Sequence, residues 1–135
     1  VIGNRIHLVG RFYRDDMLAG WPGPVHPVLA LLLAHELVHV WQWQRRAVTG
    51  FSPLAAMAEG LGGGDPYFHA ADSGRAFLAH GYEQQAAIVE DYVCHLLLDP
   101  GSPRLERLAA ILAPHLALAR IGAASISARI RSDAP

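Results

Sequence analysis

The chain has 135 residues, of which 52% are hydrophobic and 17% are charged, and its formal net charge is −1 with the histidines neutral. This composition excludes a disordered polypeptide and favours a single domain over residues 1–135. The small net charge speaks against nucleic acid as a partner. The longest apolar run, residues 28–34, excludes a membrane span, because a spanning helix needs about 20 apolar residues.

The chain opens at Val1 without an initiator methionine or an apolar leader, so we expect a domain excised from a longer protein, with its compartment undetermined. The single cysteine, Cys94, can build neither an internal disulfide nor a cysteine-rich zinc site. Any metal would therefore be bound by histidines and carboxylates.

Residues 4–13, NRIHLVGRFY, alternate polar residues with β-branched and aromatic ones, which predicts one strand or two short strands split at Gly10. Residues 15–27 are rich in glycine and proline and predict a loop. A long helix is expected over 27–47, beginning with a proline in its first turn and stopping before Gly50. Because its first half is apolar all round, this helix should be central and buried.

The second half of the chain predicts three more helices. Ser52-Pro53 is typical of an N-cap followed by proline, and opens a short helix over 52–59. The clearest helix spans 82–98, and a last one, over 103–120, is expected to kink at Pro114. The intervening segments are expected as a glycine-rich connection over 60–66, a strand or turn over 67–70, and a fraying tail from 125. Together these elements predict an α+β fold, mostly helical, with a small N-terminal sheet packed on the long helix.

The motif HELVH places His35 and His39 one turn apart on the same face of the long helix. Two imidazoles in that arrangement can bind one zinc ion at about 2.0–2.1 Å. Glu36 is rotated by about 100° around the helix axis, so it can reach a water on the ion without ligating the ion. The motif therefore predicts a zinc hydrolase in which Glu36 is the general base.

A catalytic zinc usually has three protein ligands and one open position. A third histidine six residues after the second is excluded, because that position is Arg45. A carboxylate of the 82–98 helix is favoured: Glu83 first, with Glu90 as the alternative on nearly the same face. Acidic residues near a helix N-terminus also stabilise the helix dipole. The full set of candidates is His69, His80, Glu83, Glu90, Asp91 and His95.

HELVHVWQWQ at 35–44, followed by GYEQQAAIVEDY at 81–92, resembles a group of bacterial zincin-like metallopeptidase domains that share HExxHVxQ and a downstream EQQA segment. The resemblance covers about residues 2–96, including GNRIHL as a strand flanking the site. It implies a gluzincin-like centre with His35, His39 and Glu83 as zinc ligands and Glu36 as base. Such domains occur alone or within larger proteins, often secreted or toxin-associated.

One position departs from this pattern. Thermolysin-like gluzincins have an acid four residues after the third ligand, where this chain has Ala87. Glu90 or Asp91 could orient a ligating histidine instead, or that role is vacant.

Further residues have candidate roles around the motif. Gln42 lies three residues after His39 and could support a ligand from the same face, or be part of a polar helix exterior. Tyr82 and Tyr92 could stabilise the oxyanion formed on a substrate carbonyl. The resemblance to zincins implies that residues 4–9, including Arg5 and His7, could pair with an extended peptide substrate as an edge strand, and the alternative is an ordinary strand packed on the long helix.

The predicted function is a zinc-dependent hydrolase, in particular a metallopeptidase acting on a peptide or protein substrate. The first rival is a non-catalytic docking or delivery domain of a larger protein that keeps zinc for stability, although a structural site does not need Glu36. The second rival is a helical domain without metal.

Overall fold

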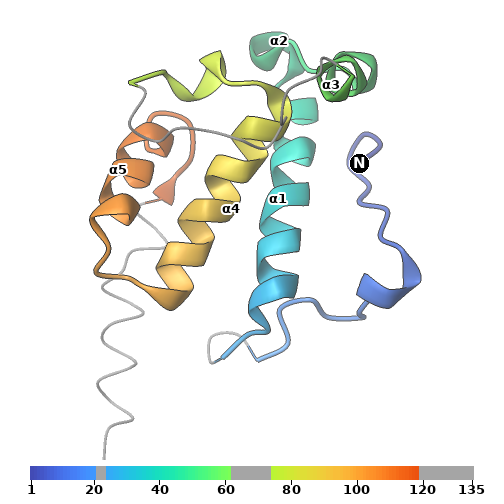
Figure 1. Ribbon diagram of the computed structural model, residues 1–135. Helices are drawn as coiled ribbons and strands as arrows, with labels where there is room; N and C mark the ends of the chain where they lie inside the picture. The colour runs from blue at the N-terminus through green and yellow to red at the C-terminus, as the bar shows by residue number, and fades with distance from the viewer. Residues whose placement is uncertain (21–23, 62–73, 119–135) are drawn as a thin grey trace, which may run out of the picture.

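The computed structural model describes residues 1–20, 24–61 and 74–118 (Figure 1). Within these ranges the chain forms five α-helices and two short 3-10 helices: η1 Gly10–Phe12, α1 Pro27–Gln44, α2 Arg46–Thr49, α3 Pro53–Gly60, η2 Phe77–Ala79, α4 Tyr82–Leu98 and α5 Pro103–Leu112. The long helices α1 and α4 lie side by side, and α5 packs on α4 (Figure 1). None of the described helices is long and apolar enough to span a membrane.

The long helix α1 begins with Pro27 at its first position, as the sequence predicts, since a missing backbone N–H costs nothing there. It ends at Gln44, three residues earlier than expected, where Arg45 leaves helical geometry with φ −101° and ψ 20°. The single turn α2 continues the chain, and Gly50 terminates α2 in the left-handed conformation with φ 69°. The expected stop at Gly50 is therefore confirmed, but the helix before it is broken in two.

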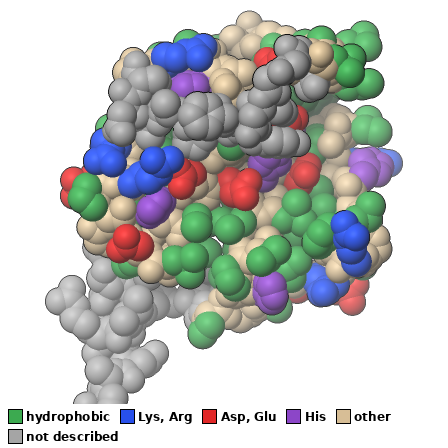
Figure 2. All heavy atoms as spheres, viewed as in Figure 1, with side chains coloured by type: hydrophobic (Ala, Val, Ile, Leu, Met, Phe, Trp, Pro, Cys, Tyr) green, Lys and Arg blue, Asp and Glu red, His purple; other side chains and the backbone are tan. Residues whose placement is uncertain are grey.

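The α1 helix is less buried than its apolar sequence suggests. Its buried residues are Ala30, Val38, His39 and Gln42, whereas Val28 is 56% and Leu37 49% exposed. Among the described helices α4 is its main neighbour, so most of its other residues are only partly buried, and hydrophobic side chains lie exposed on the face of the molecule seen in Figure 2.

The helix α4 spans Tyr82–Leu98, as predicted from the sequence. On one side it packs with α5 into the hydrophobic core, a single apolar cluster that also includes η2. The buried members of this core are Phe77, Ile88, Tyr92, Leu96, Leu105, Leu108 and Leu112.

Two shorter helices begin at serine N-caps, as their sequences predict. The hydroxyl of Ser52 accepts a hydrogen bond from the backbone N–H of Ala55, and that of Ser102 accepts one from Arg104. However, α5 ends at Leu112 and does not continue to 120. Pro114 lies just beyond this end, so it follows the helix and does not kink it.

The predicted N-terminal sheet is wrong, and with it the α+β class: the described residues form a helical fold without a strand. Within 4–13 there is only an isolated bridge between Ile2 and Arg5, followed by η1. The segment runs beside α1 on the side away from α4 (Figure 1), where Asn4 accepts a hydrogen bond from Gln44 at 3.3 Å. An extended segment becomes a stable strand only beside others, and among the described residues there is none to pair with it.

This correction removes the basis for the substrate-edge strand. Arg5 and His7 are exposed residues of an irregular segment. The strand or turn expected over 67–70, most of the connection over 60–66 and the tail from 125 lie outside the described residues.

Candidate metal centre

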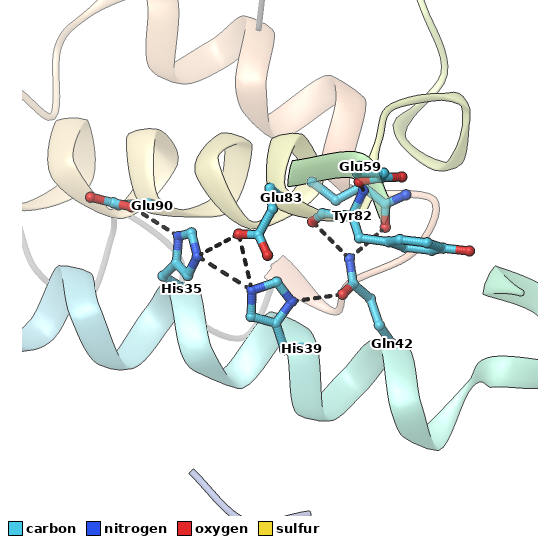
Figure 3. A network of polar contacts seen from close by, with 8 residues as sticks. His35, His39, Gln42, Glu59, Tyr82, Glu83 and Glu90 are labelled. Carbon is cyan, nitrogen blue, oxygen red and sulfur yellow. Dashed lines mark hydrogen bonds and ion pairs between the residues drawn. The ribbon is translucent and has the colours of Figure 1, made fainter. Parts of the chain in front are cut away.

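Three side chains from the two long helices converge on one point (Figure 3). The Nε2 atoms of His35 and His39, both on α1, are 3.3 Å apart. One carboxylate oxygen of Glu83, in the first turn of α4, lies 3.3 Å from Nε2 of His35 and 3.4 Å from Nε2 of His39. This group could hold a metal ion, and no second group of this kind occurs among the residues described.

The dimensions of this triangle are those of one face of a small tetrahedron. Ligands bound at about 2.0–2.1 Å to a tetrahedral ion are about 3.3–3.4 Å from each other, whereas neighbouring ligands of an octahedral ion at the same bond length are only about 2.8–3.0 Å apart. The observed separations of 3.3, 3.3 and 3.4 Å match the tetrahedral values. The donor atoms thus fit a four-coordinate ion with one position left open.

The outer nitrogens of both histidines are held by acceptors, which directs the inner nitrogens toward the shared point. Nδ1 of His35 lies 3.1 Å from a carboxylate oxygen of Glu90, which can only accept when ionised. Nδ1 of His39 lies 2.9 Å from Oε1 of Gln42. If each Nδ1 carries the proton, each Nε2 presents a lone pair, as a metal ligand must.

The orientation of the Gln42 amide follows from its other contacts. Its Nε2 donates to the backbone carbonyl of Tyr82 and to Oε1 of Gln85, both at 3.0 Å. Gln85 in turn donates to the backbone carbonyl of His80 at 2.8 Å. Because a backbone carbonyl only accepts, the amide nitrogen of Gln42 faces Tyr82 and its oxygen faces His39. Gln42 and Gln85 are buried, so this chain of hydrogen bonds is protected from water.

Charge is concentrated at the triangle. Burial lowers the pKa of His35, but hydrogen bonds and the negative charges of Glu83 and Glu90 outweigh it, so this pKa lies above the ordinary 6.5. Hydrogen bonds from His35 and His39 lower the pKa of Glu83 from 4.5 to about 2. The carboxylate of Glu83 is therefore ionised at neutral pH, and three electron-rich atoms face one another unless a proton or a cation lies between them.

Glu36, the predicted base, is half-buried on α1 next to His35. It is not part of the triangle, and the polar contacts found in the described parts of the chain do not involve it. Among the described residues, its carboxylate therefore takes part in no hydrogen bond or ion pair.

The structure separates the remaining candidates. Glu90 contacts His35, whereas Asp91 lies elsewhere on α4 and binds Arg104 at 2.6 Å and His95 at 3.5 Å. His80 is buried, and its backbone carbonyl supports Gln85. None of Asp91, His95 and His80 belongs to the triangle, and His69 lies outside the described residues.

The two tyrosines also differ in place. The ring of Tyr82 packs edge-on against Phe51 at 5.2 Å, and its hydroxyl lies 3.4 Å from the carbonyl oxygen of Thr49. Phe51 stacks on His39 at 6.2 Å, so Tyr82 supports the site through its neighbours. Tyr92 lies in the hydrophobic core, where burial raises the pKa of its hydroxyl.

Two residues around the site, Gln85 and Glu59, are not predicted from the sequence. Gln85 shares the EQQA segment with Glu83, and a polar residue on the buried side of a helix is a signal that could have revealed it. Glu59 comes from α3 and accepts a hydrogen bond from the backbone N–H of Tyr82 at 2.7 Å. Nothing in the local sequence indicates this contact, because its partners are 23 residues apart.

An apolar cavity of about 220 Å³ lies between α1, α4 and η2. It is lined by Ala34, Leu37, Val38, Trp41, Phe77, Val89 and Leu116, and none of these residues belongs to the triangle.

Comparison of the chain with models of protein families, with curated proteins and with solved structures found no match. The group of His35, His39 and Glu83 fits the metal site that the zincin-like resemblance implies. Membership in that family stays a prediction, as does the identity of the ion.

Proposed function

We propose that the protein is a zinc-dependent hydrolase, in particular a metallopeptidase. The observation that carries the proposal is the triangle of two imidazole nitrogens and one carboxylate oxygen with sides of 3.3, 3.3 and 3.4 Å. Imidazole and carboxylate ligands in tetrahedral geometry favour zinc among the available divalent ions. Three protein ligands with one open position are typical of a catalytic zinc site.

In this proposal the residues have three roles: they bind the ion, orient its ligands, or act as the general base. His35, His39 and Glu83 hold the ion, while Glu90 and Gln42 fix the ring orientations of the two histidines. The ion, when bound, supplies Lewis acidity, which lowers the pKa of water and polarises a substrate carbonyl.

Glu36 is the proposed general base. It takes a proton from the water that attacks the amide carbon, and delivers the proton to the nitrogen as the carbon–nitrogen bond breaks. Two observations support this role. Glu36 directly follows the proposed ligand His35 in the chain, and no hydrogen bond or ion pair among the described residues accounts for its half-buried carboxylate.

Metal content is the first test of the proposal. The purified protein, loaded with zinc and dialysed, should retain one equivalent by mass spectrometry, and the Glu83→Ala variant should retain much less. Less than about a tenth of an equivalent in the wild type would remove the metal site and favour the metal-free helical domain.

Peptide cleavage is the second test. A peptide library is digested with the wild type, with Glu36→Gln, and with Glu106→Gln as a matched loss of an exposed carboxylate on α5. We expect cleavage by the wild type and by Glu106→Gln, and a rate lower by at least about a hundredfold for Glu36→Gln. Equal rates for all three would remove Glu36 from its role. Zinc binding without any cleavage would favour the docking domain.

A further inference from the structure

The placement of Glu83 depends on the first turn of α4. Glu83 is the second residue of this helix, directly after Tyr82. Any shift of the helix N-terminus therefore moves its carboxylate relative to the two histidines, which belong to α1. The contacts that hold this turn determine whether the three donor atoms meet.

The backbone of Tyr82 is held from two sides (Figure 3). Its N–H donates to Oε2 of Glu59 at 2.7 Å, and its carbonyl accepts a hydrogen bond from Nε2 of Gln42 at 3.0 Å. Since Gln42 also contacts Nδ1 of His39, a continuous path of hydrogen bonds runs from α3 through the first turn of α4 to a proposed ligand on α1. The negative charge of Glu59 suits this position, because the N-terminus of a helix is electropositive.

Gly81 gives Glu59 the space for this contact. A Cβ atom at position 81 would lie 2.9 Å from Oε2 and 3.2 Å from Cδ of Glu59, so the carboxylate would have to move. The backbone of Gly81 itself is ordinary, with φ −61° and ψ 163°, and any residue can adopt it. An alanine at position 81 would therefore displace the Glu59 carboxylate without straining the backbone.

We propose that Glu59 is a positioning residue for the metal centre. By binding the N–H of Tyr82, it fixes the first turn of α4 at the place where Glu83 lies within 3.3–3.4 Å of both histidine nitrogens. The inference rests on the proposed function to the extent that His35, His39 and Glu83 bind a metal.

The test measures metal affinity and thermal stability in the same variants of the full chain. Zn²⁺ affinity is obtained by competition with a chelating dye, and the visible absorption of bound Co²⁺ reports the coordination geometry, since tetrahedral Co²⁺ absorbs more strongly than six-coordinate Co²⁺. The variants are Glu59→Ala, Glu59→Gln, Gly81→Ala, and the double variant of Glu59→Ala with Gly81→Ala. Ser102→Ala is the control, because it removes the helix cap of α5 without touching the site.

We expect Glu59→Ala and Gly81→Ala to weaken Zn²⁺ binding by about tenfold, the lower end of what residues outside the ligand set contribute, and to weaken the Co²⁺ absorption. Glu59→Gln keeps an oxygen acceptor and should bind nearly as well as the wild type. Gly81→Ala should weaken Zn²⁺ binding without lowering the melting temperature. Alanine can adopt the backbone conformation of Gly81 and reduces the conformational entropy of the unfolded chain. In the double variant the second substitution should add nothing, and Ser102→Ala should lower the melting temperature at unchanged affinity.

Where the wild type binds metal, two results overturn the inference. The first is wild-type affinity in both Glu59→Ala and Gly81→Ala; the second is an equal loss of affinity in Ser102→Ala, which would make the effect one of general stability. If the wild type binds neither Zn²⁺ nor Co²⁺, the metal centre fails and this inference fails with it. Binding by the wild type together with unchanged variants overturns the positioning role alone.

Discussion

The two faces of α4 bury different kinds of side chain. Toward α1 the helix contributes Glu83 and Glu90, whose carboxylates contact ring nitrogens of His35 and His39. Toward α5 it contributes Ile88, Tyr92 and Leu96 to the hydrophobic core. A buried polar cluster gains little net free energy, whereas apolar burial is the main stabilising term in folding.

The two faces of α4 are therefore expected to have different roles. The α5 face should determine the stability of the fold, and the α1 face should determine what the protein binds. Substitutions on the two faces should therefore change two different measurements.

The largest effect is expected from removing a proposed ligand. His39→Ala leaves two of three donors, so Zn²⁺ binding at micromolar protein should be lost in a dye competition assay. The control is His95→Ala, which removes a histidine from α4 that pairs with Asp91 outside the triangle. If His39→Ala still binds one equivalent as tightly as His95→Ala, His39 is not a ligand.

On the α5 side of α4, the Leu108→Ala substitution in α5 should destabilise the metal-free protein by about 2–5 kcal/mol. Leu108 is fully buried in the hydrophobic core, and its truncation leaves a cavity. Urea unfolding checks the value. Zn²⁺ affinity, measured where the variant is folded, should change by less than about threefold. A loss of affinity comparable to that of His39→Ala would show that the two faces are not separate.

Gln42→Leu tests the support of the ligands. It removes the acceptor for Nδ1 of His39 and the donor to the carbonyl of Tyr82, at nearly constant volume. Zn²⁺ affinity should fall by about 10–100-fold, as for other groups that orient a ligating histidine. Unchanged affinity would mean that His39 is oriented by packing against Phe51 alone.

Over the neutral range, pH is expected to change the Zn²⁺ affinity by less than the Gln42→Leu substitution does. The pKa of His35 is raised above 6.5 in the metal-free protein, and a metal requires its neutral form. Below that raised pKa, the apparent Zn²⁺ affinity should fall by about tenfold per pH unit for each histidine that carries a proton. Glu83, with a pKa of about 2, stays ionised and contributes no proton. Isothermal titration at pH 6.5, below the raised pKa of His35, in two buffers of different ionisation enthalpy counts the protons released. Release of no proton at this pH would contradict the expectation.

The stability of the metal-free protein should change with pH in the opposite direction, so that it falls as the Zn²⁺ affinity rises. Because folding raises the pKa of His35, its protonation stabilises the fold fully below pH 6.5, and this contribution is lost as the pH rises through the raised value. Metal-free and zinc-loaded samples should therefore respond to rising pH in opposite directions across this window.

The smallest effect should come from the ion pair on the α5 side of α4. Arg104 contacts Asp91 at 2.6 Å from Nη2 and 2.8 Å from Nε, and both side chains are partly exposed. Arg104→Ala should cost about 1 kcal/mol or less in urea unfolding and leave Zn²⁺ affinity unchanged. A larger loss would mean that the polar pair, and not the hydrophobic core, holds α5 in place.

The sequence predicted what depends on local pattern. The helix over 82–98 is confirmed, and the Asp99-Pro100-Gly101 run in the sequence marks its end. Helical spacing alone places His35 and His39 on one face. Glu83 was favoured from the sequence and lies with both histidines, while its role as a ligand stays a prediction.

Contacts between distant segments could not be predicted in the same way. The alternating pattern of 4–13 resembles a strand, but a strand also needs a neighbour, and the local sequence does not report whether one is present. The contact of Glu59 with Tyr82 depends on where α3 packs, and the selection of Glu90 over Asp91 depends on the rotation of α4 against α1.

The most direct test of the metal centre is the anomalous diffraction of crystals of the zinc-loaded protein, recorded at the zinc absorption edge. We expect one peak at about 2.0–2.1 Å from Nε2 of His35, Nε2 of His39 and a carboxylate oxygen of Glu83. A peak held by other residues, or no peak at this point in crystals that contain zinc, would contradict it.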